Sequence, residues 1–528
     1  MTDPIAAGLG RGWNVYDASK IERDLQLEAD VAIVGTGAGG GTAAETLADA
    51  GLHVVMIEEG PLQSSSDFHM LESEAYPALY QESAARKTKD QAITILQGRA
   101  VGGSTLVNWT SSFRAPASTL RYWRDRYGLR EYTPESLAPW FERAERRLSI
   151  ATWALPPNEN NAVLQRGART LGIPTGIVAR NVKGCANLGY CGMGCPIDAK
   201  QSMLITTIPA ALDRGAVLVH RARAQRFSVQ GDRLSDLRVS ALDPVTQKPL
   251  PHAVTIRAKI YVVAAGGIGT PALLQRSGVP DPRGLIGART FLHPVVLSAA
   301  TMREPVAAFA GAPQSVYSDR FLDEPLDGRI GFKLEVPPVH PVLTAVTMPG
   351  FGAAGARMME SFAHLQVTLA LMRDGFHAES QGGRVELASD GTPVLDYPIT
   401  GYLWKGMRRA LLAMAQIQFA AGATSVMPVH ESAWPYASWK EAQAQIAALP
   451  METMLTRVVS AHVMGGCAMG ADERTSVVDG SGRHHLLENL YAFDGSVFPT
   501  SLGANPQLSI YAIAMRNAAQ LAQRLVSR

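Results

Sequence analysis

Residues 29–40 read ADVAIVGTGAGG, and this stretch decides the fold. Its first six residues form an apolar run typical of a short buried strand, and the glycine-rich turn leads into a helix of small residues that extends to about residue 50. A second apolar run, HVVMIE at residues 53–58, predicts the next strand. Strand, tight turn, helix and strand within about 30 residues is the size of one dinucleotide-binding unit.

The turn matches the pattern G-x-G-x-x-G at Gly35, Gly37 and Gly40. The first glycine allows the tight turn, the second lets backbone N–H groups approach a pyrophosphate, and the third lets the helix pack closely on the sheet. Glu58 comes 23 residues after Gly35, at the end of the second strand, where a carboxylate can accept hydrogen bonds from ribose hydroxyls. The pattern fits NAD and FAD equally, and a glycine-rich turn in any α/β sheet is the alternative.

Composition excludes several other classes of protein. The 528 residues carry 49 Lys and Arg against 47 Asp and Glu, a net charge of +2, so no basic field exists to attract nucleic acid. No apolar run reaches the length of about 18 residues that a transmembrane helix needs. The first 30 residues lack the apolar core of a signal peptide. We expect a cytoplasmic protein by default, while export on a signal-bearing partner and peripheral membrane association stay open.

Four further segments carry a family resemblance. QGRAVGGSTLVNW at residues 97–109 resembles the first signature of the glucose–methanol–choline (GMC) oxidoreductases, and AAGGIGTPALLQRSG at 264–278 looks like the second. HVMGGCAMG at 462–470 is similar to the family's active-site segment, and DGSVFPTSLGANP at 494–506 to its closing segment. The resemblance implies an α/β fold in which a Rossmann-like FAD-binding domain joins an antiparallel-sheet substrate (cap) domain.

The resemblance also implies how the chain is divided. Residues 1–125, 200–300 and 456–528 would form a discontinuous FAD-binding domain. Residues 126–199 would supply connecting helices and a cysteine loop, and residues 301–455 the substrate-binding domain.

FAD is the cofactor that the resemblance implies. Gly102 and Gly103 would let the chain run flat along the isoalloxazine and pyrophosphate, Asn108 would present an amide to the flavin, and Asp494 lies where the family binds the ribityl chain. The expected cofactor-binding set is Gly35, Gly37, Gly40, Glu58, Gly98, Arg99, Gly102, Gly103, Ser104, Asn108, Asp494 and Pro506.

The family oxidises an alcohol by removing the hydroxyl proton and passing hydride to flavin N5. His462 matches the family's base, and Asn505 matches a second position that is His or Asn among its members. This implies that His462 accepts the proton while Asn505 donates a hydrogen bond to the oxygen. His293, in a stretch near the FAD-binding domain, is interpreted as structural or substrate-lining and not as chemical.

Cys185, Cys191 and Cys195 follow the spacing C-x5-C-x3-C, with Pro196 after the last. Thiolates so close on a glycine-rich loop can converge on one metal centre, and three ligands would suit a 3Fe–4S cluster. The spacing resembles the cluster loop of flavin-dependent sugar dehydrogenases in the GMC family. It also resembles long-chain alcohol oxidases, where these cysteines need not carry iron. A disulfide or free thiols are the remaining alternatives.

The substrate is predicted from a less recognisable region. Residues 347–364 are rich in Met, Phe, Ala and Gly, and Met358, Met359, Phe362 and Leu365 share a helical face that suits either a long acyl chain or a core helix. Together with the cysteine loop and its KQS tail at 200–202, this favours a long-chain alcohol oxidase.

The predicted reaction is FAD-dependent oxidation of a long-chain primary alcohol to its aldehyde. The alternative is a sterol oxidase or a sugar dehydrogenase that passes electrons to a partner protein through a 3Fe–4S cluster. Without the cluster, oxygen or a quinone could reoxidise the flavin directly. A small companion subunit is a hypothesis suggested by the cysteine loop and the uncertain export route.

Overall fold

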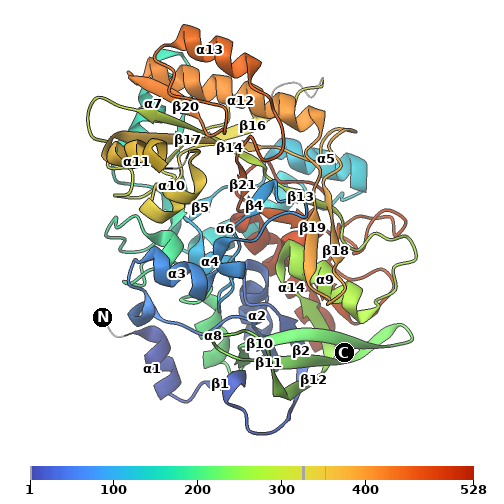
Figure 1. Ribbon diagram of the computed structural model, residues 1–528. Coiled ribbons are helices and arrows are strands. Elements are labelled where there is room, and N and C mark those ends of the chain that lie inside the picture. The colour runs from blue at the N-terminus through green and yellow to red at the C-terminus, as the bar shows by residue number, and fades with distance from the viewer. Residues whose placement is uncertain (1–2, 324–327, 351, 528) are drawn as a thin grey trace.

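The computed structural model describes residues 3–323, 328–350 and 352–527. Figure 1 shows one sheet at the lower end of the molecule and a second sheet at the upper end, with helices packed around both. Among the described residues, no helix combines the length and the apolar character needed to cross a bilayer.

The lower sheet contains the dinucleotide-binding unit predicted from residues 29–58. Its strands lie in the order β1 (Asn14–Asp17), β9 (Val217–His220), β3 (Val54–Ile57), β2 (Leu25–Val34), β12 (Pro249–Val263), β11 (Arg233–Leu242) and β10 (Ala222–Gln230), and β23 (Leu490–Ala492) pairs with β12. From β1 to β12 along this order, each strand is parallel to its neighbour, and β23 is parallel to β12. β11 and β10 extend the sheet with antiparallel pairs. The strands of this sheet come from distant parts of the chain, and their mixed arrangement with helices agrees with the predicted α/β fold class.

Two helices pack together beside the glycine-rich turn. α2 (Ala38–Asp49) follows the glycine-rich turn, and α14 (Gln507–Val526) packs against α2 and against α6 (Pro134–Arg147). α14 is buried along most of its length. The C-terminal segment therefore places the residues just before α14 beside the N-terminal unit.

The upper sheet forms the cap. Its order is β4 (Ile93–Ile95), β21 (Val458–Ser460), β14 (Val295–Thr301), β17 (Leu365–Met372), β16 (Phe332–Glu335), β15 (Val316–Ser318) and β7 (Gly176–Ile177), and β20 (Ser425–Pro428) also pairs with β14. All pairs are antiparallel except β4 with β21, as expected for the cap. Several of its strands lie outside residues 301–455, so the predicted division of the chain stays a prediction.

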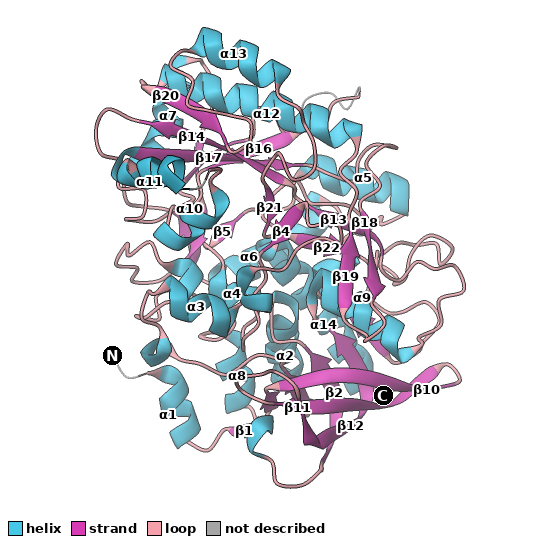
Figure 2. Cartoon of the chain, in the orientation of Figure 1, coloured by secondary structure: helices cyan, strands magenta, loops and turns pink. Residues whose placement is uncertain are grey.

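Several helices surround the cap sheet. Figure 2 shows α12 (Gly401–Ala420) and α13 (Trp439–Ala448) at the top of the molecule, and α10 (Pro341–Thr347) and α11 (Gly352–Glu360) at its left side. α12 contacts β14, β17 and β20. The remaining longer helices are α1 (Pro4–Gly10), α3 (Glu72–Leu79), α5 (Ala117–Tyr127), α7 (Glu159–Thr170), α8 (Thr207–Asp213) and α9 (Gly266–Ser277).

A small sheet joins the two ends of the molecule. Its order is β19 (Pro393–Asp396), β18 (Gly383–Leu387), β13 (Ala288–Leu292) and β22 (Val463–Gly465). In the antiparallel pair β13–β22, Leu292 lies opposite Val463. The register therefore brings His293, which follows β13, next to His462, which precedes β22.

Candidate active site

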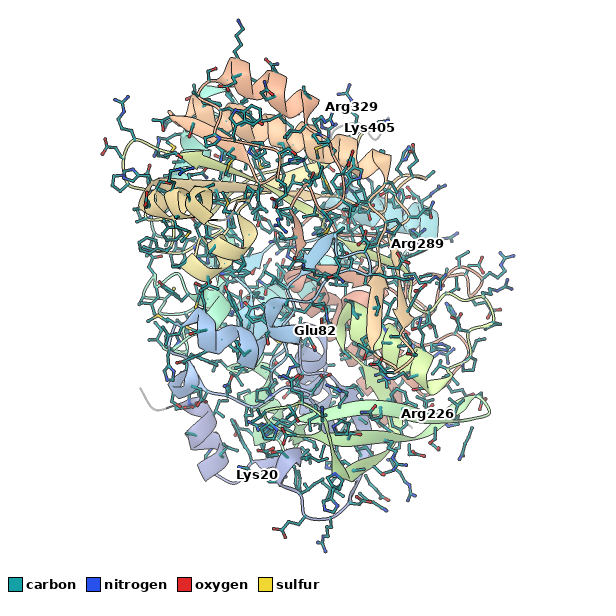
Figure 3. The ribbon with its side chains drawn as sticks, viewed as in Figure 1. Lys20, Glu82, Arg226, Arg289, Arg329 and Lys405 are labelled. Carbon is teal, nitrogen blue, oxygen red and sulfur yellow. The ribbon has the colours of Figure 1, made fainter. Side chains whose placement is uncertain are left out.

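A large cavity lies between residues of the lower sheet and residues of the cap sheet. Its volume is about 1020 Å³, at the upper end of the range of about 300–1,000 Å³ usual for ligand sites. Its wall begins at Gly35 and Glu58 of the lower sheet and includes His462 and Asn505 in the middle. Glu82, another lining residue, lies near the middle of the view in Figure 3.

The glycine-rich turn allows a dinucleotide to approach the backbone. Gly35 has φ +95°, which favours glycine, and a Cβ at Gly40 would lie 1.9 Å from the Gly35 carbonyl oxygen. Gly37 caps α2 without a side-chain hydrogen bond, so the N–H groups of the first turn remain available to an anion. A Cβ at Gly103 would lie 2.7 Å from the Gly37 Cα. The closely packed glycines fit the pyrophosphate of FAD.

Glu58 binds the turn as well as lining the cavity. Its Oε2 accepts hydrogen bonds from Thr36 N at 3.0 Å and Thr36 Oγ1 at 2.7 Å, and its Oε1 accepts one from Gly60 N at 3.0 Å. Burial raises the pKa of this carboxyl group. A carboxylate oxygen has more than one lone pair, so these bonds leave capacity for a ribose hydroxyl. The ribose contact stays a prediction.

The loop at residues 97–109 lies against this turn. Gly98 N donates to Ser104 Oγ at 3.0 Å, and Gly102 N donates to Thr36 Oγ1 at 3.0 Å. Gly98, Gly103 and Ser104 line the cavity. Arg99 is buried behind it, where burial lowers the pKa of the guanidinium group. Among the described residues, Gly40, Arg99 and Gly102 do not belong to the cavity wall, so they would support the loop from behind.

Asn108 lines the cavity and is held from two sides. Its Nδ2 donates to Gln507 Oε1 at 2.7 Å, and its backbone oxygen accepts a hydrogen bond from Lys200 Nζ at 2.6 Å. Lys200 is buried and also donates to the Cys191 carbonyl oxygen at 2.9 Å. Burial lowers the pKa of this amine to about 8. In the sequence Lys200 was recognised only as part of the KQS motif, and its role in positioning Asn108 was not predicted.

Asp494 joins the second signature to the closing segment. Its Oδ2 accepts hydrogen bonds from Gly266 N at 2.7 Å and Thr270 Oγ1 at 2.6 Å, and its Oδ1 accepts one from Ser496 N at 2.8 Å. Burial raises the pKa of this carboxyl group. Asp494 and Pro506, the N-cap of α14, both line the cavity. Their place in the wall fits their predicted role in holding FAD.

His462 lies against a second histidine. His462 Nδ1 and His293 Nδ1 are 2.9 Å apart, and Gly503 N donates to His293 Nε2 at 3.0 Å. Burial lowers the pKa of His462 to about 4, so the ring is neutral near pH 7. His462 lines the cavity whereas His293 is buried behind it.

Asn505 lies against a buried carboxyl group. Asn505 Nδ2 donates to Glu335 Oε2 at 3.2 Å, and Gln314 Nε2 donates to the same oxygen at 2.9 Å. Burial raises the pKa of Glu335 to about 7. Glu335 Oε1 and Asn505 Oδ1 are buried without a hydrogen-bond partner in the described part of the chain. Glu335 was not among the residues predicted for the site; its signal in the sequence was two charged residues, Lys333 and Glu335, within a strand that is otherwise apolar.

The upper part of the cavity is apolar. β14, β17, α10 and the segments beside them supply Val295, Leu297, Val339, Val342, Leu343, Val346, Met348, Val367, Leu369, Leu371, Val429, Met454 and Val459. The predicted helical face of Met358, Met359, Phe362 and Leu365 is not part of the wall formed by the described residues. Met358 and Phe362 pack against the cap core instead, which favours the core-packing alternative for this segment over a lining for an acyl chain.

The three clustered cysteines are free thiols and half-buried. Cys191 Sγ accepts a hydrogen bond from Arg180 Nη2 at 3.5 Å, and Cys185 Sγ accepts one from Asn187 N at 3.4 Å. Within residues 3–323, 328–350 and 352–527, no three His, Cys, Asp or Glu side chains are placed to hold a metal ion together. Cys185, Cys191 and Cys195 therefore give the predicted 3Fe–4S cluster no geometric support.

Comparison with known proteins decides the family. The models of the GMC oxidoreductase family match residues 76–295 and 378–514, which together are more than half of the chain. This chain is a GMC oxidoreductase. It is therefore a flavin-dependent oxidoreductase that acts on alcohol-type substrates, and the family implies FAD as its cofactor.

Other GMC oxidoreductases resemble this one over nearly its whole length. An uncharacterized GMC-type oxidoreductase of Sinorhizobium fredii is 30% identical over 499 residues, which cover 94% of this chain and 95% of that protein. A long-chain-alcohol oxidase of Arabidopsis thaliana is 27% identical over 534 residues, covering 96% of this chain and 68% of that protein.

Solved structures share the fold. Pyridoxine 4-oxidase from Mesorbium loti has a TM-score of 0.69 at 19% identity and covers 93% of this chain and 98% of its own. A formate oxidase has a TM-score of 0.70 at 15% identity and covers 96% of this chain and 99% of its own. At these identities the likeness concerns the fold alone.

Proposed function

We propose that this GMC oxidoreductase oxidises a long-chain aliphatic primary alcohol to its aldehyde. One observation carries the proposal: a group of apolar side chains from the cap lines the same cavity as His462 and Asn505. An alkyl chain can lie against β14, β17 and α10 while its hydroxyl group lies beside the two polar residues. The resemblance to long-chain-alcohol oxidases supports the same substrate class.

The chain's own residues would bind, orient and deprotonate the alcohol. Burying the alkyl chain releases water from apolar surface, which stabilises the complex by about 0.8 kcal/mol for each buried CH₂ group. His462 and Asn505 hold the hydroxyl group, and His462 is the residue assigned to take its proton. FAD, when bound, supplies the acceptor for the hydride.

The glycine-rich turn, the 97–109 loop, Asn108 and Asp494 are the residues proposed to hold FAD. No step of the proposal uses the cysteine loop, because the three thiols are not gathered as a ligand set. No companion subunit is part of the proposal either.

The test is anaerobic reduction of the bound flavin by dodecanol, cholesterol or glucose, followed by absorbance in a stopped-flow instrument. Rapid bleaching by dodecanol alone supports the proposal. Faster bleaching by cholesterol or glucose would overturn the substrate class in favour of a sterol oxidase or a sugar dehydrogenase.

The visible spectrum of the same preparation tests the iron–sulfur alternative. Flavin bands alone are expected, whereas a broad additional absorbance with matching iron content would assign the cysteine loop to a cluster.

A further inference from the structure

The hydrogen bonds around His293 have a fixed direction, because one partner is a backbone amide. Gly503 N–H can only donate, so His293 Nε2, 3.0 Å away, must carry a lone pair. His293 is therefore not the doubly protonated imidazolium. A neutral imidazole with an unprotonated Nε2 has its single proton on Nδ1.

That proton lies on the side of His462. His293 Nδ1 is 2.9 Å from His462 Nδ1, so His293 donates and His462 Nδ1 accepts. With Nδ1 unprotonated, neutral His462 carries its own proton on Nε2. His462 Nε2 makes no hydrogen bond to the described residues, and it is not fully buried. It is therefore open to the cavity that His462 lines.

We propose that His293 is a positioning residue that holds neutral His462 with its proton on Nε2, so that in the resting enzyme His462 meets the substrate oxygen as a hydrogen-bond donor. This deepens the proposed function and rests on it for the identity of the substrate. It also revises the interpretation of His293 as structural or substrate-lining. The low pKa values of both rings, which burial causes, agree with a neutral pair.

The two histidines are paired by the fold. His293 directly follows β13 and His462 directly precedes β22, and the register sets Leu292 opposite Val463. Both side chains therefore leave the same end of one antiparallel pair and meet at nearly perpendicular ring planes, with 88° between them. Each ring has a partner for the nitrogen that turns away from the cavity, which fixes its orientation.

The pair defines two alternative states of the site. In the resting state His462 donates from Nε2, which suits an alkoxide or the carbonyl oxygen of the aldehyde. As a base, His462 needs a lone pair on Nε2 and a proton on Nδ1, and His293 must then accept at Nδ1 and carry its own proton on Nε2. That proton would point at the Gly503 N–H, so the base state loses the Gly503 hydrogen bond. His293 therefore disfavours the base state of His462. His462 can act as a base only after its bond to His293 reverses and the bond from Gly503 to His293 breaks.

Asn505 lines the same cavity. Its Nδ2 donates a hydrogen bond to Glu335, and its Oδ1 is buried without a partner among the described residues. The donor role of His462 in the resting state is the reverse of the acceptor role that the family resemblance implies for it.

The direct test is ¹⁵N NMR of holoenzyme labelled at histidine, recorded near pH 7, with signals assigned through His462→Gln. The expected wild-type result is a protonated Nε2 and an unprotonated Nδ1 at His462. His484 is an internal reference, because its Nδ1 accepts the Leu486 N–H at 3.1 Å and should show the same tautomer. A protonated Nδ1 at His462, or an even mixture of both tautomers, overturns the proposal.

Variants at position 293 add a second test. In His293→Asp the ionised carboxylate has no hydrogen to donate and can only accept, so the proton of His462 should move to Nδ1. In His293→Leu the preference for one tautomer should be lost. The matched control His484→Gln should leave the His462 signals unchanged. If His293→Asp and His293→Leu both keep the wild-type tautomer, His293 does not set it.

Failure of any alcohol to reduce the flavin would reject the proposed function while leaving the tautomer result standing.

Discussion

Asn505 Nδ2 donates to Glu335 Oε2 at 3.2 Å, although the two residues are 170 positions apart in the chain. Glu335 has no exposed surface, and its second oxygen has no partner among the described residues. The protonation state of this buried carboxyl group therefore sets how Glu335 bonds to the Asn505 amide. An ionised Glu335 accepts a hydrogen bond from the amide N–H, whereas a protonated Glu335 has a hydrogen that it can donate to Asn505 Oδ1.

Glu335 should give flavin reduction its pH dependence. Burial raises the pKa of Glu335 to about 7, while the pKa of His462 is about 4. We expect the rate of flavin reduction by dodecanol to change around pH 7, and Glu335→Gln to remove that inflection. The nearby groups Lys333 and Asp319 also act on Glu335, so Asp319→Asn is a matched control that should shift the inflection without abolishing it. An unaltered profile in Glu335→Gln would contradict the assignment.

Glu335 should also make stability depend on pH. Its folded pKa of about 7 lies above the unfolded value of 4.5, so the folded state binds more protons between these values. The free energy of unfolding should therefore fall as pH rises from 4.5 to 7, by roughly 3 kcal/mol at about 1.4 kcal/mol per pKa unit. Urea unfolding of the apoprotein at several pH values should show a smaller fall in Glu335→Gln. Equal slopes in both proteins would reject the raised pKa.

Gly37→Ala should weaken FAD binding without harming the fold. Gly37 has a negative φ, and a Cβ there meets only Gly103 Cα at 3.9 Å, an ordinary contact. The added methyl group would instead occupy the approach to the helix N-terminus. We expect at least about tenfold weaker FAD binding, equivalent to about 1.4 kcal/mol, by titration of the apoprotein. Gly10→Ala, where a Cβ meets nothing within 4 Å, is the control. Unchanged affinity would remove Gly37 from the pyrophosphate site.

His462→Ala should slow flavin reduction by about 10²-fold or more, because the hydroxyl oxygen loses its partner and its proton acceptor. The measurement is the limiting rate at saturating dodecanol, which separates the chemical step from binding. FAD content should stay at the wild-type level, since His462 contributes no hydrogen bond to the glycine-rich turn. A wild-type rate in this variant would end the catalytic assignment.

Leu369→Trp should shorten the apolar part of the cavity. Leu369 belongs to β17, which is buried along its whole length, and its side chain lines the cavity. We expect kcat/KM for dodecanol to fall about tenfold relative to hexanol, within the 1–3 kcal/mol typical of changes in an apolar pocket. Val245→Trp, at a residue that is 87% exposed, should leave the ratio unchanged. Equal losses on both alcohols would place the alkyl chain elsewhere.

The dinucleotide-binding unit and the site residues that lie within motifs could be predicted from the order of the amino acids alone. Residues 29–58 form β2, α2 and β3 as predicted, because apolar periodicity and glycine in a tight turn act over a few neighbouring residues. His462, Asn505 and Asp494 could be predicted as site residues because each belongs to a short recognisable segment. All three line the cavity.

The groups that surround those residues are set by long-range packing and could not be predicted from the motifs. Glu335 lies beside Asn505 because β16 joins the cap sheet, and His293 lies beside His462 because β13 pairs with β22. These contacts join residues about 170 positions apart, and no local pattern encodes strand pairing over such a distance. The same long-range packing placed α11 outside the cavity and α10 in its wall. Proton positions and substrate lining follow from these contacts, so the direction of hydrogen bonding at the substrate could not be predicted from the motifs alone.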